Sequence, residues 1–148
     1  MIDVACGSGV LFPDYRKRKV CLTGIDISSE MVKKAKSKFP EIDVICGDVE
    51  SFEFDKQFDV VMVYNAFPHF SDPAFLIKRL SELVKEKGRL CVAHGMSREA
   101  LLKHHQRAKN VSIDLLEIDE LVELFKPYFD IEVSISDENM YQVVGRKR

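Results

Sequence analysis

The sequence predicts one α/β domain over residues 1–148, built on a doubly wound, mostly parallel sheet of seven strands with an antiparallel hairpin at its carboxyl end. Apolar runs of strand length alternate with segments of helical period, which is typical of parallel strands joined by crossover helices. The middle runs are apolar at consecutive positions, as in 60–63 (Val-Val-Met-Val), which indicates strands covered on both faces. Only residues 137–139 separate the last two runs, and so short a link requires antiparallel pairing.

The expected strands and helices follow these runs in chain order. Ser28 and Asp72 are expected to cap helices, and Pro73 fits the first helical position after Asp72. That second helix is expected to end at Gly88, and a later helix to end before Pro127. The expected strands are Ile2–Val4, Val20–Asp26, Ile42–Cys46, Phe58–Tyr64, Arg89–His94, Ile131–Ser136 and Tyr141–Arg146.

The composition is that of a globular protein and argues against several other classes. Hydrophobic residues make up 46% and charged residues 31%, with a net charge of −2, whereas disorder requires fewer aliphatic residues and a larger net charge. The near-neutral balance argues against nucleic acid as the partner, because a dedicated nucleic-acid binder usually has a basic face. No apolar run is long enough to cross a bilayer, and no secretory signal stands at the amino terminus.

The four cysteines, Cys6, Cys21, Cys46 and Cys91, stand far apart in the sequence. No CxxC pair and no histidine at metal-ligand spacing accompanies them, so the sequence predicts no metal site. Free thiols inside apolar runs pack as small hydrophobic groups. We therefore expect a reduced, cytoplasmic protein in which the cysteines are structural.

A turn of small residues follows the first strand. The segment from Asp3 to Gly9 has small residues at positions 5, 7 and 9, which lets the backbone turn sharply and approach a ligand closely. By itself this motif is common to ordinary turns. It differs from the nicotinamide fingerprint Gly-x-Gly-x-x-Gly, whose third glycine would fall at Phe12, and no Gly-Lys-Ser/Thr of a P-loop follows it.

Carboxylates also stand at the ends of the next two strands, at the edge where open α/β sheets bind ligands. Asp26 lies 23 residues after Asp3 and could accept both hydroxyls of a ribose; its alternative role is a helix cap, which Ser28 fills better. Asp48 could accept from the exocyclic amine of adenine while the Val49 amide donates to a ring nitrogen. Three carboxylate-bearing strand ends in succession indicate a nucleoside site.

This ordered set of motifs resembles class I S-adenosylmethionine-dependent methyltransferases of the small-molecule type, related to the quinone-biosynthesis methyltransferases. The matching motifs are Asp-x-Ala-x-Gly-x-Gly at 3–9, Gly-Ile-Asp-Ile-Ser at 24–28, Gly-Asp-Val at 47–49, and Phe-Asp-Val-Val at 58–61 before a histidine-bearing loop. The resemblance covers nearly the whole chain, final hairpin included, and implies a Rossmann-like methyltransferase fold. The chain differs from the family at Ala5, where glycine is usual.

The resemblance implies S-adenosylmethionine as cofactor, S-adenosylhomocysteine as its product and a small-molecule methyl acceptor as partner. It also places the cofactor-binding residues. They are Asp3, Ala5, Cys6, Gly7 and Gly9 around the methionine moiety, with Asp3 near the ammonium group; Asp26 at the ribose; Ile27 and Met31 beside adenine; Gly47, Asp48 and Val49 at the adenine edge; and Asn65 and Ala66 near the sulfonium.

His69 is the candidate catalytic residue. Methyl transfer rests mainly on alignment and exclusion of water, and a base is needed only for acceptors such as a phenol, an alcohol or an amide. His69 follows the fourth strand by five residues and could be that base; alternatively, it ends a loop before the Asp72 cap. His94 could face the acceptor or be a buried histidine, and His104 and His105 are expected to be solvated.

The chain begins late for this family, in which one or two helices normally precede the first strand, roof the cofactor and shape the acceptor pocket. Here Met1 and Ile2 directly precede Asp3. A start codon assigned too late, a truncation, or a remnant that dimerises over the exposed face would each explain this. Two functions stay open, an active methyltransferase or a non-catalytic adenosyl-cofactor-binding module with a regulatory role. The methyl acceptor and its target atom (C, N, O or S) stay open as well.

Overall fold

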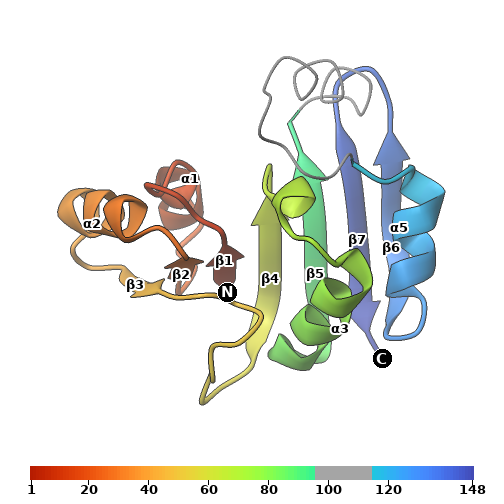
Figure 1. Cartoon of the computed structure of the whole chain (residues 1–148), viewed down its shortest axis with the longest axis horizontal. Helices are drawn as coiled ribbons and strands as arrows, with labels where there is room; N and C mark the ends of the chain where they lie inside the picture. The colour runs from red at the N-terminus through yellow and green to blue at the C-terminus, as the bar shows by residue number, and fades with distance from the viewer. Residues whose placement is uncertain (96–114) are drawn as a thin grey trace.

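A computed structural model of the chain describes residues 1–95 and 115–148, and its centre is one seven-stranded sheet in the order β3-β2-β1-β4-β5-β7-β6 (Figure 1). The pairs from β3 across to β5 are parallel, whereas β5 pairs with β7 and β7 with β6 in antiparallel register. The predicted mostly parallel sheet with a terminal hairpin is therefore confirmed. The strands are β1 (Ile2–Val4), β2 (Thr23–Asp26), β3 (Asp43–Cys46), β4 (Phe58–Tyr64), β5 (Val84–His94), β6 (Phe129–Ser136) and β7 (Tyr141–Lys147).

Two of the described helices, α2 and α3, begin at the residues that the sequence marks as caps. The Ser28 hydroxyl accepts from the Met31 N–H at 3.3 Å, and the Asp72 carboxylate accepts from the Phe75 N–H at 3.0 Å, so both predicted caps are confirmed. The helices are α1 (Phe12–Lys17), α2 (Ser29–Lys38), the short 3₁₀ helix η1 (Phe67–His69), α3 (Pro73–Leu83) and α5 (Ile118–Phe125).

Three predicted boundaries are wrong. Lys19 has φ 55° and forms a turn, and the following Val20 is 36% exposed and turns back toward α1, so β2 begins at Thr23 and not at Val20. The helix α3 ends at Leu83 and not at Gly88, because Val84 is already extended, with φ −89° and ψ 129°. The strand β5 therefore begins at Val84 and not at Arg89, and Lys87, with φ 64°, lies within it. The other strand limits differ from the predicted ones by one or two residues or agree with them.

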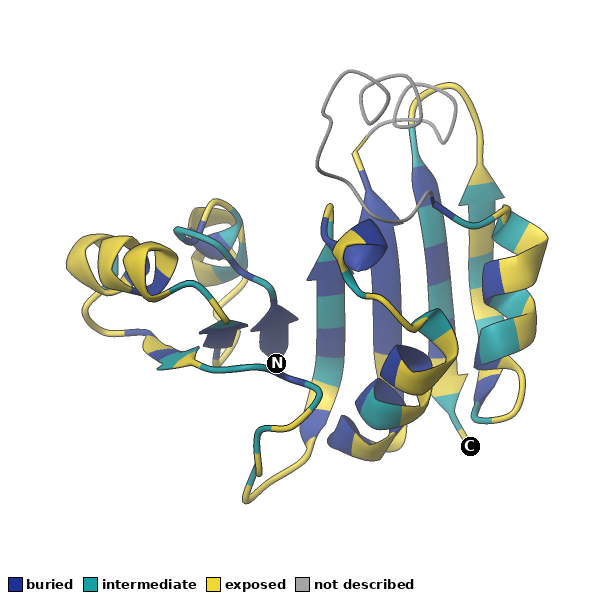
Figure 2. Ribbon diagram, viewed as in Figure 1, coloured by how far each residue is buried: buried dark blue, intermediate teal, exposed yellow. Residues whose placement is uncertain are grey.

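Two apolar clusters hold helices against opposite faces of the sheet, as expected for a doubly wound fold. The larger cluster joins α3 and α5, through residues such as Leu80 and Phe125, to the strands β4, β5 and β7. The smaller cluster joins α1 and α2, through Phe12 and Val32, to β2 and β3. Figure 2 shows β1 and the upper part of β5 buried, while most of α2 is exposed. This packing leaves the carboxyl ends of β1 to β4 between the two groups of helices.

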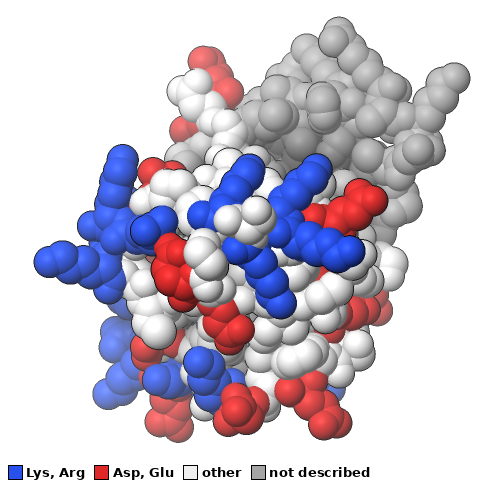
Figure 3. All heavy atoms as spheres, turned by 90° about the vertical axis from the view of Figure 1, so that its left-hand side faces the viewer, with Lys and Arg blue, Asp and Glu red and all other residues white. Residues whose placement is uncertain are grey.

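The α1–α2 end of the molecule carries many exposed basic side chains, and Figure 3 looks directly onto it. Acidic side chains lie among the basic ones, and Arg16 pairs with Glu41 at 3.1 Å. The basic residues of these two segments are Arg16, Lys17, Arg18, Lys19, Lys33, Lys34, Lys36 and Lys38. No helix within 1–95 and 115–148 is long and apolar enough to cross a membrane.

Candidate functional site

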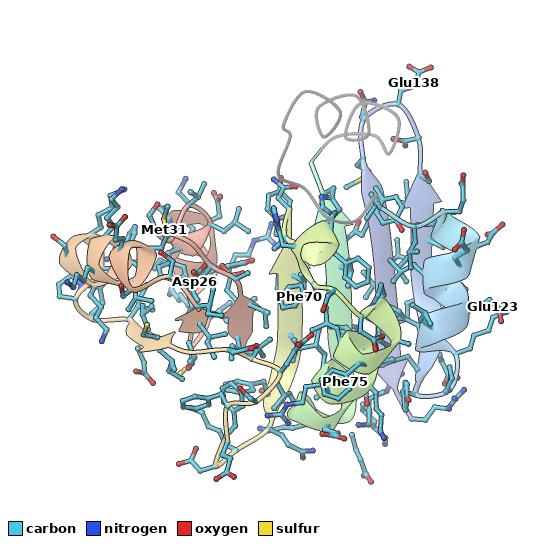
Figure 4. The ribbon with its side chains drawn as sticks, viewed as in Figure 1. Asp26, Met31, Phe70, Phe75, Glu123 and Glu138 are labelled. Carbon is cyan, nitrogen blue, oxygen red and sulfur yellow. The ribbon has the colours of Figure 1, made fainter. Side chains whose placement is uncertain are left out.

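A cavity of about 650 Å³ opens at the carboxyl ends of β1, β2, β3 and β4. This is the edge at which open α/β sheets bind ligands. All the predicted site residues except Gly9 line it: Asp3, Ala5, Cys6, Gly7, Asp26, Ile27, Met31, Gly47, Asp48, Val49, Asn65, Ala66 and His69. Figure 4 shows Asp26 and Met31 on the β2–α2 side and Phe70, which also lines the cavity, toward α3.

The turn after β1 is left-handed at alternate positions. Ala5 has φ 57°, Gly7 has φ 58° and Gly9 has φ 86°. A Cβ on Gly9 would lie 2.6 Å from the Phe12 ring, so this glycine lets α1 pack close to the turn and does not line the cavity. Ala5 holds the conformation that favours glycine, which explains why its family position usually carries that residue.

Asp26 joins the end of β2 to this turn. One carboxylate oxygen accepts from the Gly7 N–H at 2.8 Å, and the other accepts from the Ser28 N–H at 2.9 Å. Asp26 thus has a local structural role as well as facing the cavity. An ionised carboxylate has about four lone-pair positions, so two remain for a ligand.

Asp3 is a buried carboxyl group at the cavity wall. It is 3% exposed, and within the described residues nothing donates a hydrogen bond to its side chain. Burial, and then the neighbouring Asp26 carboxylate, raise the pKa of Asp3 from 3.8 to about 7. A buried carboxylate is stable only with a partner, so this position is suited to a cationic group of a ligand.

The thiol of Cys6 lies in the same wall but is not a nucleophile. Burial, and then Asp3 and Asp26, raise the pKa of Cys6 to about 12, so the group stays protonated. This agrees with the structural role expected for the cysteines, and Cys91 is buried as well. Cys21 and Cys46 are exposed, so the expectation of buried packing is wrong for these two.

The loop after β3 offers both an acceptor and a donor. Asp48 uses one carboxylate oxygen to accept from the Glu50 N–H at 2.9 Å, which fixes the turn and leaves its other oxygen for a ligand. The Val49 N–H makes no hydrogen bond among the described residues, although Val49 is only 4% exposed. An unpaired buried N–H next to a cavity is a donor for a bound molecule.

At the end of β4, Asn65 has φ 57° and bridges to β5. Its N–H donates to the Ala93 carbonyl at 2.9 Å, and its side-chain oxygen accepts from the Gly95 N–H at 3.0 Å. His69 follows in η1, where its N–H donates to the Ala66 carbonyl at 3.0 Å and its exposed side chain lines the cavity.

The structure adds cavity residues that sequence reasoning missed: Val4, Val10, Leu11, Ile25, Glu50, Tyr64, Phe70 and Ser71. Val10 is 77% exposed although it is apolar, and its place directly after the glycine turn could have marked it. One oxygen of the Glu50 carboxylate is buried without a hydrogen bond in the described part of the chain. Burial, and then Asp48 and Asp72, raise the pKa of Glu50.

His94 is not among the residues that line the cavity. His94 is 1% exposed and packs edge-on against Tyr141, with 5.9 Å between the ring centres, as expected for the alternative of a buried histidine. Tyr141 donates in turn to the Leu116 carbonyl at 2.9 Å. His104 and His105, with the rest of 99–111, lie outside the described residues.

Comparison with known families agrees with this geometry. A family model described as a methyltransferase domain matches residues 2–92, which include every strand end that borders the cavity. The chain belongs to the methyltransferase domain family. Its sheet order and terminal hairpin are those of the class I S-adenosylmethionine-dependent methyltransferase fold.

Two curated relatives of this methyltransferase domain are each 32% identical to it over 61% of the chain. They are the malonyl-(acyl-carrier protein) O-methyltransferase of Priestia megaterium and the ubiquinone biosynthesis O-methyltransferase of Coxiella burnetii. The match covers 34% of the first relative and 41% of the second, so the matched part is well under half the length of either.

Solved structures show the same fold at low identity. Magnesium protoporphyrin IX methyltransferase from Synechocystis, solved with bound S-adenosylhomocysteine, superposes with a TM-score of 0.78 and 16% identity. The superposition covers 99% of this methyltransferase domain and 73% of the other chain. It therefore includes the final hairpin, which lies beyond the part that matches the family model.

Proposed function

We propose that this methyltransferase domain binds S-adenosylmethionine in the cavity and transfers its methyl group to a small-molecule acceptor, releasing S-adenosylhomocysteine. The observation that carries the proposal is the Asp3 carboxyl, which is 3% exposed, faces the cavity and has no hydrogen-bonding partner in the described residues. The ammonium group of the methionine moiety supplies the missing cation. The names of two curated relatives, a malonyl-(acyl-carrier protein) O-methyltransferase and a ubiquinone biosynthesis O-methyltransferase, support an acceptor that carries a small-molecule group.

The remaining cavity residues fit the rest of the cofactor. The two free lone-pair positions of Asp26 accept the ribose hydroxyls, and the apolar side chains of Ile27 and Met31 flank the adenine. The free oxygen of Asp48 accepts from the adenine amine, and the unpaired Val49 N–H donates to a ring nitrogen. Each ligand group thus meets a protein group of opposite hydrogen-bonding character.

Methyl transfer from a sulfonium requires little from the protein beyond alignment of the acceptor atom, the methyl group and the sulfur. When bound, the cofactor supplies an electrophilic methyl group on a sulfonium. The cavity residues hold the methyl toward the end of β4, where Asn65 and Ala66 lie, and exclude water from the line of attack. For an acceptor with an ionisable hydroxyl, His69 takes the proton.

Several broader features belong to the same proposal. The chain forms a single domain over 1–148 and works in the cytoplasm. It has no nucleic-acid substrate, which is supported by the mixture of acidic and basic side chains on its α1–α2 end (Figure 3). A homodimer covers the face around the amino terminus. Light scattering that shows only monomers would refute the dimer without touching the cofactor assignment.

Thermal unfolding with S-adenosylhomocysteine tests the cofactor assignment. Ligand at a hundred times its dissociation constant should add about 2.7 kcal/mol to the free energy of unfolding. Asp26→Ala should abolish the shift, since it removes the ribose acceptors and the contact that holds Gly7. Glu123→Gln, on the exposed side of α5 away from the cavity (Figure 4), should keep the full shift. No shift with the wild-type domain would refute the proposal.

A further inference from the structure

We infer that the Asn65 side-chain amide donates a hydrogen bond to the nucleophilic atom of the methyl acceptor, and that this atom is an oxygen and not an amine nitrogen. The inference rests on the proposed function and goes beyond it by naming the class of acceptor. It starts from the orientation of one side chain at the end of β4, where the cavity meets the loop that carries His69.

The orientation of the Asn65 amide is fixed by its partner. A backbone N–H can only donate, so the atom that faces the Gly95 N–H at 3.0 Å must be the carbonyl oxygen of the side chain. The amide nitrogen, with two donor hydrogens, is then the remaining polar atom of the side chain. It makes no hydrogen bond within 1–95 and 115–148, while Asn65 lines the cavity.

The backbone around Asn65 holds this arrangement. Asn65 has φ 57°, a conformation that asparagine tolerates better than most residues, and its N–H donates to the Ala93 carbonyl at 2.9 Å. Gly95 approaches closely because it lacks a Cβ, which would lie 2.3 Å from the Tyr64 hydroxyl oxygen. Main-chain and side-chain contacts to β5 therefore leave the amide little freedom to flip.

Two acceptors next to the Asn65 amide are already engaged, whereas the His69 imidazole lines the same cavity. The side-chain oxygen of Asn65 is bonded to Gly95, and the Ala66 carbonyl accepts from the His69 N–H at 3.0 Å. A neutral amine has one lone pair, which it needs for attack, and its N–H groups require acceptors. Facing the Asn65 amide, such an amine would oppose donor to donor. The position in front of the Asn65 amide is therefore unsuited to an amine nitrogen, whatever acceptors its N–H groups find elsewhere in the cavity.

An oxygen nucleophile fits the same groups. It has a second lone pair, so one pair can accept from Asn65 while the other attacks the methyl carbon. The new O–C bond forms as the C–S bond breaks, and the sulfur keeps the electron pair of the broken bond as a neutral thioether. A hydroxyl acceptor gives its proton to the imidazole of His69, whereas a carboxylate acceptor has none to lose.

The test compares three variants and three matched acceptors. Asn65→Asp keeps the oxygen that binds Gly95 but replaces the donor with an acceptor; Asn65→Gly removes the side chain at a φ that glycine adopts freely. Asn139→Asp makes the same charge change in the exposed β6–β7 turn and is the control. The probes are a phenol, a benzoate and an aniline with the same ring substituents. S-Adenosylhomocysteine formation is followed by mass spectrometry, with its binding and that of 5′-methylthioadenosine measured separately.

We expect methyl transfer to an oxygen probe and none to the aniline. Asn65→Asp should lower the oxygen reaction about 10- to 100-fold, as for loss of a hydrogen bond to a charged group. Asn65→Gly should lower it less, and the control Asn139→Asp should match wild type in both the oxygen reaction and the binding of S-adenosylhomocysteine.

Three results would overturn the inference. The first is methyl transfer to the aniline, or a rate of S-adenosylhomocysteine formation with the phenol and the benzoate that is no higher than with the aniline. The second is an unchanged oxygen reaction in Asn65→Asp. The third is weaker binding of S-adenosylhomocysteine but not of 5′-methylthioadenosine in Asn65→Asp, because the amide would then serve the cofactor's carboxylate. In all three cases the cofactor still binds the wild-type domain; failure of that binding would instead refute the proposed function.

Discussion

The buried Asp3 carboxyl gives the structure a measurable dependence on pH. Replacing Asp3 with Asn keeps the size of the side chain and removes its ionisation. In the folded protein the pKa of Asp3 rises from 3.8 to about 7, mainly through burial. The folded state therefore holds a proton that the unfolded state releases between these two values. Ionised Asp3 thus destabilises the unliganded fold, from no effect below pH 3.8 to its full effect above pH 7.

The size of the effect follows from the two values. A rise from 3.8 to about 7 corresponds to about 4 kcal/mol between the fully protonated and fully ionised forms. Between pH 5 and pH 8 the same linkage gives a change of about 2.6 kcal/mol. Asp3→Asn should lack this change. The unfolding free energy of the variant should therefore rise relative to that of the wild type by the same amount between pH 5 and pH 8.

Urea unfolding from pH 5 to pH 8 measures this difference. Circular dichroism is the suitable signal, because the chain has no tryptophan. Taking the variant as reference removes every other group that titrates in both proteins. A difference in unfolding free energy that stays constant over this range would show that Asp3 ionises normally, and would remove the main support for a cationic ligand at this position. With S-adenosylhomocysteine bound, the unfolding free energy of the wild type should lose the part of its pH dependence that comes from Asp3, because the ligand's ammonium group stabilises the carboxylate.

Four further substitutions test the turn after β1 and one helix cap. Gly9→Ala should destabilise the fold by about 2–4 kcal/mol, because its Cβ would lie 2.6 Å from the Phe12 ring at φ 86°; Gly7→Ala, with φ 58° and nothing within 4 Å, should lose only about 1–2 kcal/mol, as urea unfolding would show. Ala5→Gly should raise the unfolding free energy by up to about 1 kcal/mol, since φ 57° favours glycine, and a loss of stability would show that its methyl group packs usefully. Asp72→Ala should lower the melting temperature through loss of about 1 kcal/mol of capping, and an unchanged value would contradict the 3.0 Å bond to the Phe75 N–H.

The parts of the fold that the sequence predicted are those set by local chemistry. Ser28 and Asp72 cap helices because a short polar side chain reaches the N–H three residues on, and this spacing is visible in the sequence. The end of α3 was placed wrongly at Gly88 because glycine is the usual signal for the end of a helix, whereas Val84 is already extended and begins β5. The left-handed residue beside that glycine is Lys87. Non-glycine residues with positive φ carry no clear sequence signal.

The same distinction applies to the site. Asp26 and Asp48 could be expected at the cavity because strand ends of a parallel sheet meet at one edge. The bond between Asn65 and Gly95 joins residues 30 positions apart, and its geometry depends on a backbone conformation that the sequence does not reveal. The pKa of Asp3 likewise depends on burial under the finished fold. The residue types were predictable, but their hydrogen-bonding roles were not.

Features that destabilise the unliganded fold gather at the cavity. Ala5 and Asn65 both have φ 57°, and Asp3 is buried without a partner in the described part of the chain. The other two non-glycine residues with positive φ in the described part of the chain, Lys19 and Lys87, are exposed and lie away from the cavity. Unfavourable conformations and unpaired buried groups persist where a ligand later compensates for them. Because a cationic ligand group would stabilise Asp3 only when the carboxyl is ionised, ligand binding should strengthen as the pH rises toward 7 and release a proton below it.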